Sequence, residues 1–168
     1  AMQPLSDADR LQWLRLSRTE NVGPITFYRL IEHYGSPQEA LNALPELAKR
    51  GGRKKPLIAP DMGIIQRESE VLKNLGGQII CVADEAYPLA LSAIDDAPPV
   101  ISVLGNPNLL NKNCVAMVGS RNASINGRKF ASKLAGELGH RGQIVVSGLA
   151  RGIDTAAHEG SLESGTIA

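Results

Sequence analysis

Several features that define other protein classes are scarce in this chain of 168 residues. It has only two cysteines, too few for a disulfide framework, and no run of about 18 apolar residues that could cross a bilayer. The start, Ala1-Met2-Gln3-Pro4, lacks the basic and apolar regions of a secretory signal. We therefore expect a cytoplasmic protein without a membrane partner. Cys81 and Cys114 each lie in an apolar run, which predicts packed thiols in a reducing compartment.

Aromatic residues and net charge are also low. The aromatic fraction of 4% argues against a base-stacking surface of the RRM or OB type. The net charge of +1 hides an asymmetry, because the segment Lys112 to Arg151 carries seven basic residues and one acid, whereas the remainder carries 11 basic and 16 acidic residues. A local excess of +6 indicates where a polyanion could bind. Part of it, Lys129 and Lys133 with Glu137, has the spacing of a solvated helix face.

What the chain does contain, in residues 1–75, is the pattern of a small helical domain. Capping sequences begin helices at Ser6-Asp7-Ala8-Asp9 and at Ser36-Pro37-Gln38-Glu39, and Pro24 suits the first turn of another. Asp61 can cap a further helix, which Gly76-Gly77 ends. We place the domain boundary near these glycines, so that residues 76–168 form the second domain.

Short apolar runs replace the helical periodicity in that second domain. Four near-continuous runs are typical of strands covered on both faces: Gln78–Val82, Val100–Leu104, Cys114–Val118 and Ile144–Val146. Two helix-length segments, residues 126–140 and 152–162, alternate with the last of these runs and with Thr166-Ile167-Ala168. This order predicts an α/β fold with a mainly parallel, Rossmann-like sheet. Because a doubly wound sheet has further strand-helix units, we expect the domain to continue beyond Ala168.

Two glycine-containing loops follow successive strands and should both lie at the carboxyl edge of the sheet, where open α/β sheets bind ligands. In each loop, small residues allow a tight turn, a hydroxyl can donate a hydrogen bond, and an arginine can grip phosphate oxygens at a helix start. The candidate residues are Gly119, Ser120 and Arg121 in the first loop and Ser147, Gly148 and Arg151 in the second. The pair suits a ligand with repeated phosphates, although tight structural turns would have the same composition.

Two nucleotide motifs are absent. Neither G-x-G-x-x-G, with an acid ending the next strand, nor the P-loop G-x-x-x-x-G-K-[ST] occurs. Asp154 and His158 lie four residues apart, but a first-turn acid and a packed histidine explain them more simply. The spacing places no nucleophile with a base and no metal ligands together, so we expect no catalytic residues, no cofactor and no enzymatic turnover.

At these loops the chain resembles the DNA-processing protein A family (DprA, also called Smf). The matching stretches are Val115–Arg121, Gly127, Val145–His158 and Gly165–Ala168, and upstream Asp84–Leu91 with Asp96–Val100. The resemblance implies a helical N-terminal domain of the sterile-alpha-motif or helix-hairpin-helix kind and a Rossmann-like domain that forms homodimers. It also implies binding of single-stranded DNA and loading of the RecA recombinase onto it during natural transformation.

The resemblance places the family's phosphate pocket on Gly119, Ser120, Arg121, Ser147 and Gly148; our own interpretation of the second loop adds Arg151. Further DNA contacts of the family would lie after Ala168. An alternative is an enzyme acting on nucleoside monophosphates, such as a phosphoribohydrolase. It would need a catalytic carboxylate, for which Asp154 or Glu163 is the available source.

Overall fold

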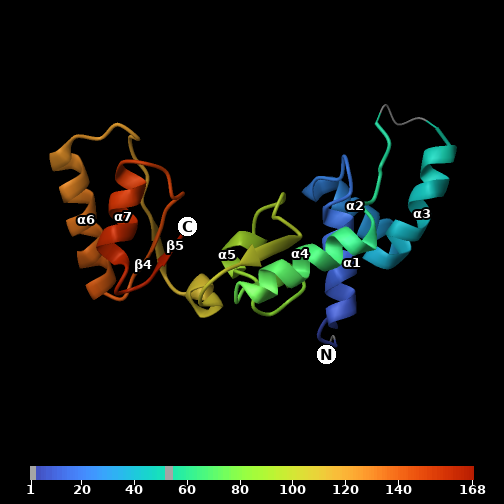
Figure 1. Ribbon diagram of the computed structural model, residues 1–168, viewed down its shortest axis with the longest axis horizontal. Helices are drawn as coiled ribbons and strands as arrows, with labels where there is room; N and C mark the ends of the chain where they lie inside the picture. Colours follow the sequence, from blue (N-terminus) through green and yellow to red (C-terminus); the bar gives the residue numbers. More distant parts are fainter. Residues whose placement is uncertain (1–2, 52–54) are drawn as a thin grey trace. The chain divides into compact units, whose positions relative to one another are not determined.

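The computed structural model describes residues 3–51 and 55–168, which fall into two compact units, Ala1–Pro107 and Asn108–Ala168. In the first unit, four helices are followed by a strand pair and one short helix (Figure 1). These elements are α1 (Asp7–Ser17), α2 (Pro24–Tyr34), α3 (Pro37–Lys49), α4 (Met62–Asn74), β1 (Gln78–Cys81), α5 (Leu89–Ser92) and β2 (Val100–Val103). The second unit begins within the short 3-10 helix η1 (Pro107–Asn111) and contains β3 (Cys114–Ala116), α6 (Ile125–His140), β4 (Ile144–Val146), α7 (Ile153–Ser161) and β5 (Thr166–Ile167).

The helices begin and end where local chemistry directs. Ser6 accepts a hydrogen bond from the Asp9 N–H while the Asp9 carboxylate accepts one from the Ser6 N–H, which completes the predicted capping box of α1. Ser36 caps α3 in the same way through the Glu39 N–H. Pro24 occupies the first turn of α2, and that helix ends at Gly35, whose φ of 87° is left-handed. Asp61 precedes α4 as expected, but its side chain makes no capping hydrogen bond.

The core of the first unit has two parts. Phe27 lies fully buried among the helices, and its ring centroid is 5.3 Å from that of Trp13. A second cluster joins Leu14 and Ile65 of the helices to Cys81 of β1 and Val100 of β2. Because this cluster ties the strand pair to the helices, the compact units divide after Pro107, whereas the sequence pattern changes near Gly76.

The strand pair differs from what its sequence indicates. We expected β1 and β2 to resemble the other apolar runs, with both faces covered. Instead, β1 and β2 form a separate antiparallel pair, with Cys81 opposite Val100 and Gln78 opposite Val103. Only part of each strand is buried, which is the usual condition of an antiparallel pair with one face on a core.

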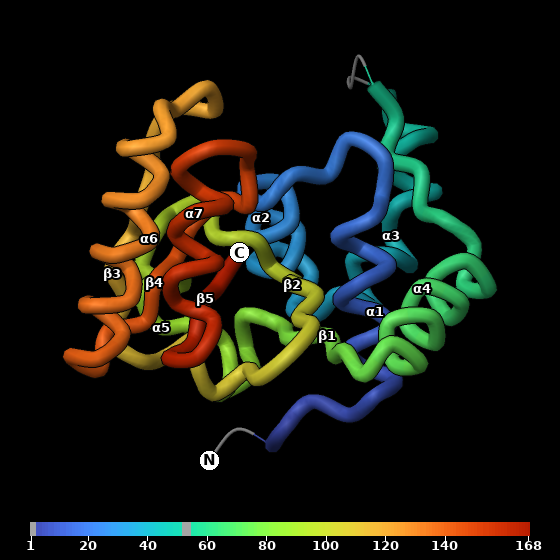
Figure 2. Tube along the Cα trace, turned by 60° about the vertical axis from the view of Figure 1, so that its left-hand side comes forward, coloured from blue at the N-terminus to red at the C-terminus, as the bar shows by residue number. Residues whose placement is uncertain are grey.

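The second unit contains the predicted parallel sheet. Its strand order is β3-β4-β5, with Val115 opposite Val145 and Val145 in turn opposite Thr166. Helices α6 and α7 run side by side and pack on β4, as Figures 1 and 2 show. Right-handed connections between strands added in one direction put both helices on the same face, and Ala135, Val145 and Ala157 form the core beneath them.

This one-sided covering corrects two predictions. Residues Cys114 and Ala116 of β3 are exposed, so this strand is not covered on both faces in the way its apolar sequence suggested. The thiol of Cys114 is exposed as well, whereas Cys81 is buried as expected. In the described part of the chain, none of the helices combines the length and apolar character needed to traverse a lipid bilayer.

Candidate functional site

The two predicted loops lie against each other at one edge of the sheet. The Ile153 N–H at the start of α7 donates to the Ser120 carbonyl oxygen at 3.2 Å. Just before the loops, the Met117 N–H donates to the Val146 carbonyl oxygen at 2.9 Å. Both loops follow the carboxyl ends of their strands, so the prediction of one shared edge is confirmed.

The close approach depends on two glycines. A Cβ at Gly152, where φ is 83°, would collide with the Ser120 carbonyl oxygen and lie 2.7 Å from that of Arg121. A Cβ at Gly119 would lie 2.7 Å from the Cβ of Ile153. Both positions therefore need glycine to let one loop touch the other.

The first loop presents its candidate residues to solvent. Gly119, Ser120 and Arg121 are exposed, and the Ser120 hydroxyl oxygen accepts a hydrogen bond from the Asn122 N–H at 3.2 Å. The next residue of interest, Ser124, caps α6 by accepting from the Gly127 N–H at 3.1 Å. Ser124 is not among the predicted site residues, although a serine three residues before Gly127 is a usual sequence signal of a helix cap.

The second loop divides its candidates between two roles. Gly148 and Arg151 are exposed, whereas Ser147 is only 5% exposed and its hydroxyl donates to the Met117 carbonyl at 2.7 Å. The structure thus places the Ser147 side chain in the contact between the two loops. Its hydroxyl proton is engaged there, so any role of Ser147 in anion binding would run through the position of the loop.

Asp154 and His158 hold the second loop and the sheet together. The buried Asp154 carboxylate accepts from the Ala150 N–H at 3.4 Å, so it braces the turn that carries Arg151. His158 Nδ1 lies 2.7 Å from the Thr166 hydroxyl, which donates its single proton to Val145 at 3.0 Å. Nδ1 is therefore the donor to Thr166. These contacts agree with the structural interpretation of both residues, and Glu163, the other carboxylate considered, is exposed.

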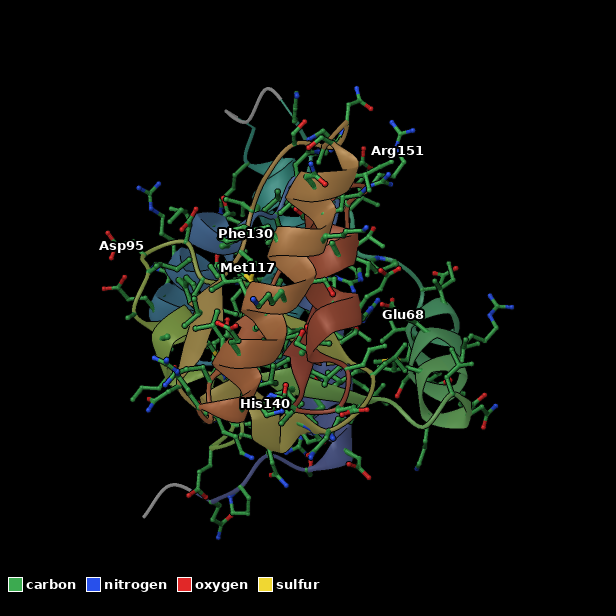
Figure 3. All side chains as sticks on the ribbon, turned by 90° about the vertical axis from the view of Figure 1, so that its left-hand side faces the viewer. Glu68, Asp95, Met117, Phe130, His140 and Arg151 are labelled. Carbon is green, nitrogen blue, oxygen red and sulfur yellow. The ribbon has the colours of Figure 1, made fainter. Side chains whose placement is uncertain are left out.

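The electrostatic character of this edge is positive. Figure 3 shows Arg151 near the N-terminal end of α6 and His140 at the C-terminal end of that helix. Among the described residues of this unit, the ion pair within 4.0 Å joins Lys133 to Glu137 and does not involve Arg121 or Arg151. No group of three or more His, Cys, Asp or Glu side chains among residues 3–51 and 55–168 is arranged to hold a metal ion.

A helical domain followed by a parallel α/β unit, with two paired glycine loops at its carboxyl edge, defines a protein of Rossmann-like type. Two sequence families match the chain: residues 78–168 match the family described as DNA recombination-mediator protein A, and residues 7–70 match the DprA-like N-terminal HHH domain. The chain belongs to the DNA-processing protein A (DprA/Smf) family.

Individual relatives support this assignment. The chain is 45% identical to DNA processing protein DprA of Streptococcus pneumoniae over 84 residues, which cover 50% of the chain and 29% of the relative. It is 29% identical to protein Smf of Synechocystis sp. over 170 residues, covering 94% of the chain and 42% of the relative. The chain therefore spans less than half the length of these two curated relatives.

A solved structure agrees in fold. The X-ray structure of DprA from Streptococcus pneumoniae is similar with a TM-score of 0.64 and 27% identity, covering 99% of the chain and 58% of that structure. Both the helical N-terminal domain and the small parallel α/β domain thus agree in fold with that structure.

Proposed function

We propose that this protein binds single-stranded DNA through its phosphates, without sequence specificity, at the paired loops. The observation that carries the proposal is the contact between residues 119–121 and 147–153, which presents Arg121 and Arg151 together at the start of two helices. Guanidinium groups are suited to phosphate oxygens, which they can bind two at a time. None of the features at this edge reads a base, which favours sequence-independent binding.

The family supports a role in recombination. Relatives of this chain are described as DNA processing proteins, and the matching family is described as a recombination mediator. In line with the family resemblance, we propose that a homodimer of this protein helps load RecA onto the bound strand in the cytoplasm during natural transformation.

Binding without chemical turnover is the second part of the proposal. The carboxylate nearest the loops, Asp154, is 7% exposed and accepts from the Ala150 N–H, which favours a bracing role over attack on a ligand. Incubation of the full chain with nucleoside monophosphates should release no free base. Release of base that disappears in Asp154→Asn would favour the phosphoribohydrolase alternative instead.

Substitution of Arg121 tests the binding site. Arg121→Ala should weaken binding of all single-stranded oligonucleotides alike and flatten the dependence of log affinity on log salt by about 0.7, the contribution of one phosphate contact. Lys112→Ala is a matched control, because Lys112 is exposed and precedes β3, whereas the loops follow their strands. Fluorescence anisotropy of a labelled oligothymidine measures both quantities. An affinity of Arg121→Ala equal to that of the control would reject the site.

A further inference from the structure

A second basic feature lies in the same unit, next to the paired loops, and shares Arg151 with them. It is a groove of about 790 Å³ between the outer faces of α6 and α7. Four cationic side chains line this groove, with Glu159 as its acidic member: Arg128, Lys129, Lys133 and Arg151. We call it the α6–α7 groove.

The cations of the α6–α7 groove are available for a ligand. Arg128, Lys129 and Arg151 are exposed, and among the described residues the ion pairs within 4.0 Å include none of these three. Lys133 pairs with Glu137 at 4.0 Å, but its side chain is 78% exposed. A pair so exposed contributes little and yields readily to a competing anion.

Ser132 also lines the groove and carries a hydroxyl, whereas the Thr155 hydroxyl donates to the Ala150 carbonyl at 2.7 Å. Sequence spacing alone suggested a solvated helix face for Lys129 and Lys133. Both lysines are exposed as that spacing predicts, and the packing of α7 against α6 adds Arg151 and Thr155 to the same surface and makes it concave.

Arg151 connects the groove with the paired loops. It belongs to the second loop and also lines the groove, so the two basic surfaces are continuous at the carboxyl edge of the sheet. From Arg128 to Lys133 the helix axis rises about 7.5 Å, which matches about two phosphate spacings at the 3.4 Å rise of a stacked strand.

We infer that the α6–α7 groove binds the next phosphates of the same single strand of DNA that the paired loops hold. This inference rests on the proposed function and extends it. It gives the bound strand a path that leads from the paired loops, past Arg151, and along α6. The site takes a polyanion and reads no base, because its lining offers cations and the Ser132 hydroxyl and no aromatic side chain.

The double variant Arg128→Ala with Lys129→Ala tests the groove while leaving Arg121 and Arg151 in place. Alanine is the best helix former, so α6 should be retained. The matched control is Lys112→Ala with Arg141→Ala, which removes the same charges from residues that precede β3 and β4 and so lie at the opposite edge of the sheet. Circular dichroism confirms that both variants of the full chain are folded.

Binding is measured with oligothymidines of about 4 and about 20 nucleotides, at the lower end of and beyond the site sizes of roughly 4–16 nucleotides known for single-strand binders. For the longer probe, the groove variant should lose about tenfold in affinity and its salt slope should fall by about 1.4, corresponding to two phosphates. For the shorter probe, and for the opposite-edge control, affinity should stay close to that of the unmodified chain.

The outcomes separate this inference from the proposed function. If Arg121→Ala weakens binding but the groove variant behaves as the opposite-edge control does, the inference is overturned and the paired-loop site stands. If the groove variant loses affinity for the long probe and Arg121→Ala does not, the paired-loop site is rejected, and with it the continuation of the strand from the loops into the groove. Equal losses of the groove variant on both probes would also overturn the inference, because they show no continuation of the strand.

Discussion

At the scale of single residues, the candidate site depends on one backbone position, Gly152. Its φ of 83° is unfavourable for any residue with a side chain, and its missing Cβ leaves space for the carbonyl oxygens of Ser120 and Arg121. The contact is between backbone groups, so a neighbouring side chain cannot move aside to accommodate a substitution.

Gly152→Ala should therefore destabilise the second unit by more than the roughly 1–3 kcal/mol of backbone strain alone. Gly142→Ala is the control, because Gly142 has a similar φ of 78° but has open space around its missing Cβ. Urea denaturation of both variants, followed by circular dichroism, gives the difference. Equal losses of stability would contradict the importance of the close approach.

The two cysteines differ in burial and therefore in the expected reactivity of their thiols. Burial raises the pKa of the Cys81 thiol to about 12, so almost none of it is thiolate at pH 8, whereas Cys114 is exposed. A maleimide or iodoacetamide should modify Cys114 in the native protein and reach Cys81 only after denaturation. Mass spectrometry of Cys114→Ser should show no rapid modification; a fast reaction in that variant would contradict the burial of Cys81.

The raised pKa of Cys81 also has a consequence for stability. Its folded-state pKa of about 12 lies above its usual value of 9.0, so the unfolded state loses its thiol proton first as pH rises. The free energy of unfolding should fall between pH 9 and pH 12, and Cys81→Ala should reduce that slope. An unchanged slope in denaturation curves across this window would contradict it.

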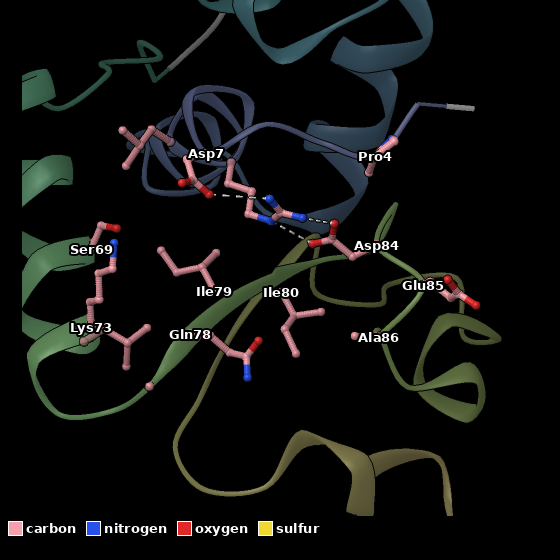
Figure 4. Close-up of a pocket in the computed structure, with 14 residues that line it drawn as sticks. Pro4, Asp7, Ser69, Lys73, Gln78, Ile79, Ile80, Asp84, Glu85 and Ala86 are labelled. Carbon is pink, nitrogen blue, oxygen red and sulfur yellow. Dashed lines mark hydrogen bonds and ion pairs between the residues drawn. The ribbon is translucent and has the colours of Figure 1, made fainter. Parts of the chain in front are cut away.

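At the scale of elements, the turn after β1 is fastened to α1 by a charged contact. Arg10 Nη2 donates to Asp84 Oδ1 at 2.6 Å, and Asp84 Oδ2 also accepts from the Cys81 N–H at 2.8 Å. Both side chains line a hollow of about 510 Å³, in which Figure 4 shows Asp84. The Asp84 side chain is 11% exposed, so its loss would leave buried donors without an acceptor.

Asp84→Ala should therefore cost about 1.5–3 kcal/mol of stability, the range for hydrogen bonds to charged groups. Glu68→Ala is a control for the exposed pair of Arg18 with Glu68, where the side chains are 44% and 36% exposed and a loss below about 1 kcal/mol is expected. Fluorescence of Trp13, which lies in the same unit, measures the unfolding of the Asp84→Ala and Glu68→Ala variants. Similar losses would show that the Asp84 contacts are not specially stabilising.

The positions of helices and strands were easier to predict from the sequence than the way these elements pair and pack with one another. The apolar run Ile144–Val146 and the capping box at Ser6 identify a strand and a helix because these signals are local. The antiparallel pairing of β1 with β2 has no such signal, since apolar runs do not record the direction of a partner. The burial of Ser147 and the α6–α7 groove likewise arise from contacts between elements far apart in the sequence.

At the scale of the whole chain, the charge is divided between segments of opposite sign. The segment Lys112–Arg151 carries +6 and the remaining residues −5, and the groove and loop cations all belong to the positive segment. With Arg121, Arg128, Lys129, Lys133 and Arg151 each contacting one phosphate, the salt slope for one bound chain should not exceed about 3.5 in magnitude on a single strand. A salt titration with a long oligothymidine measures it, and a clearly steeper slope would require cations elsewhere.

The hydrogen bond from Ile153 to Ser120 joins residues on either side of helix α6 and strand β4. During synthesis on the ribosome, the first loop emerges well before its partner, and it has no second loop to rest on until β4 and the start of α7 have left the exit tunnel. The proposed binding of DNA at the paired loops should therefore be absent from a nascent chain until α7 has begun to form. It would then arise in a single step.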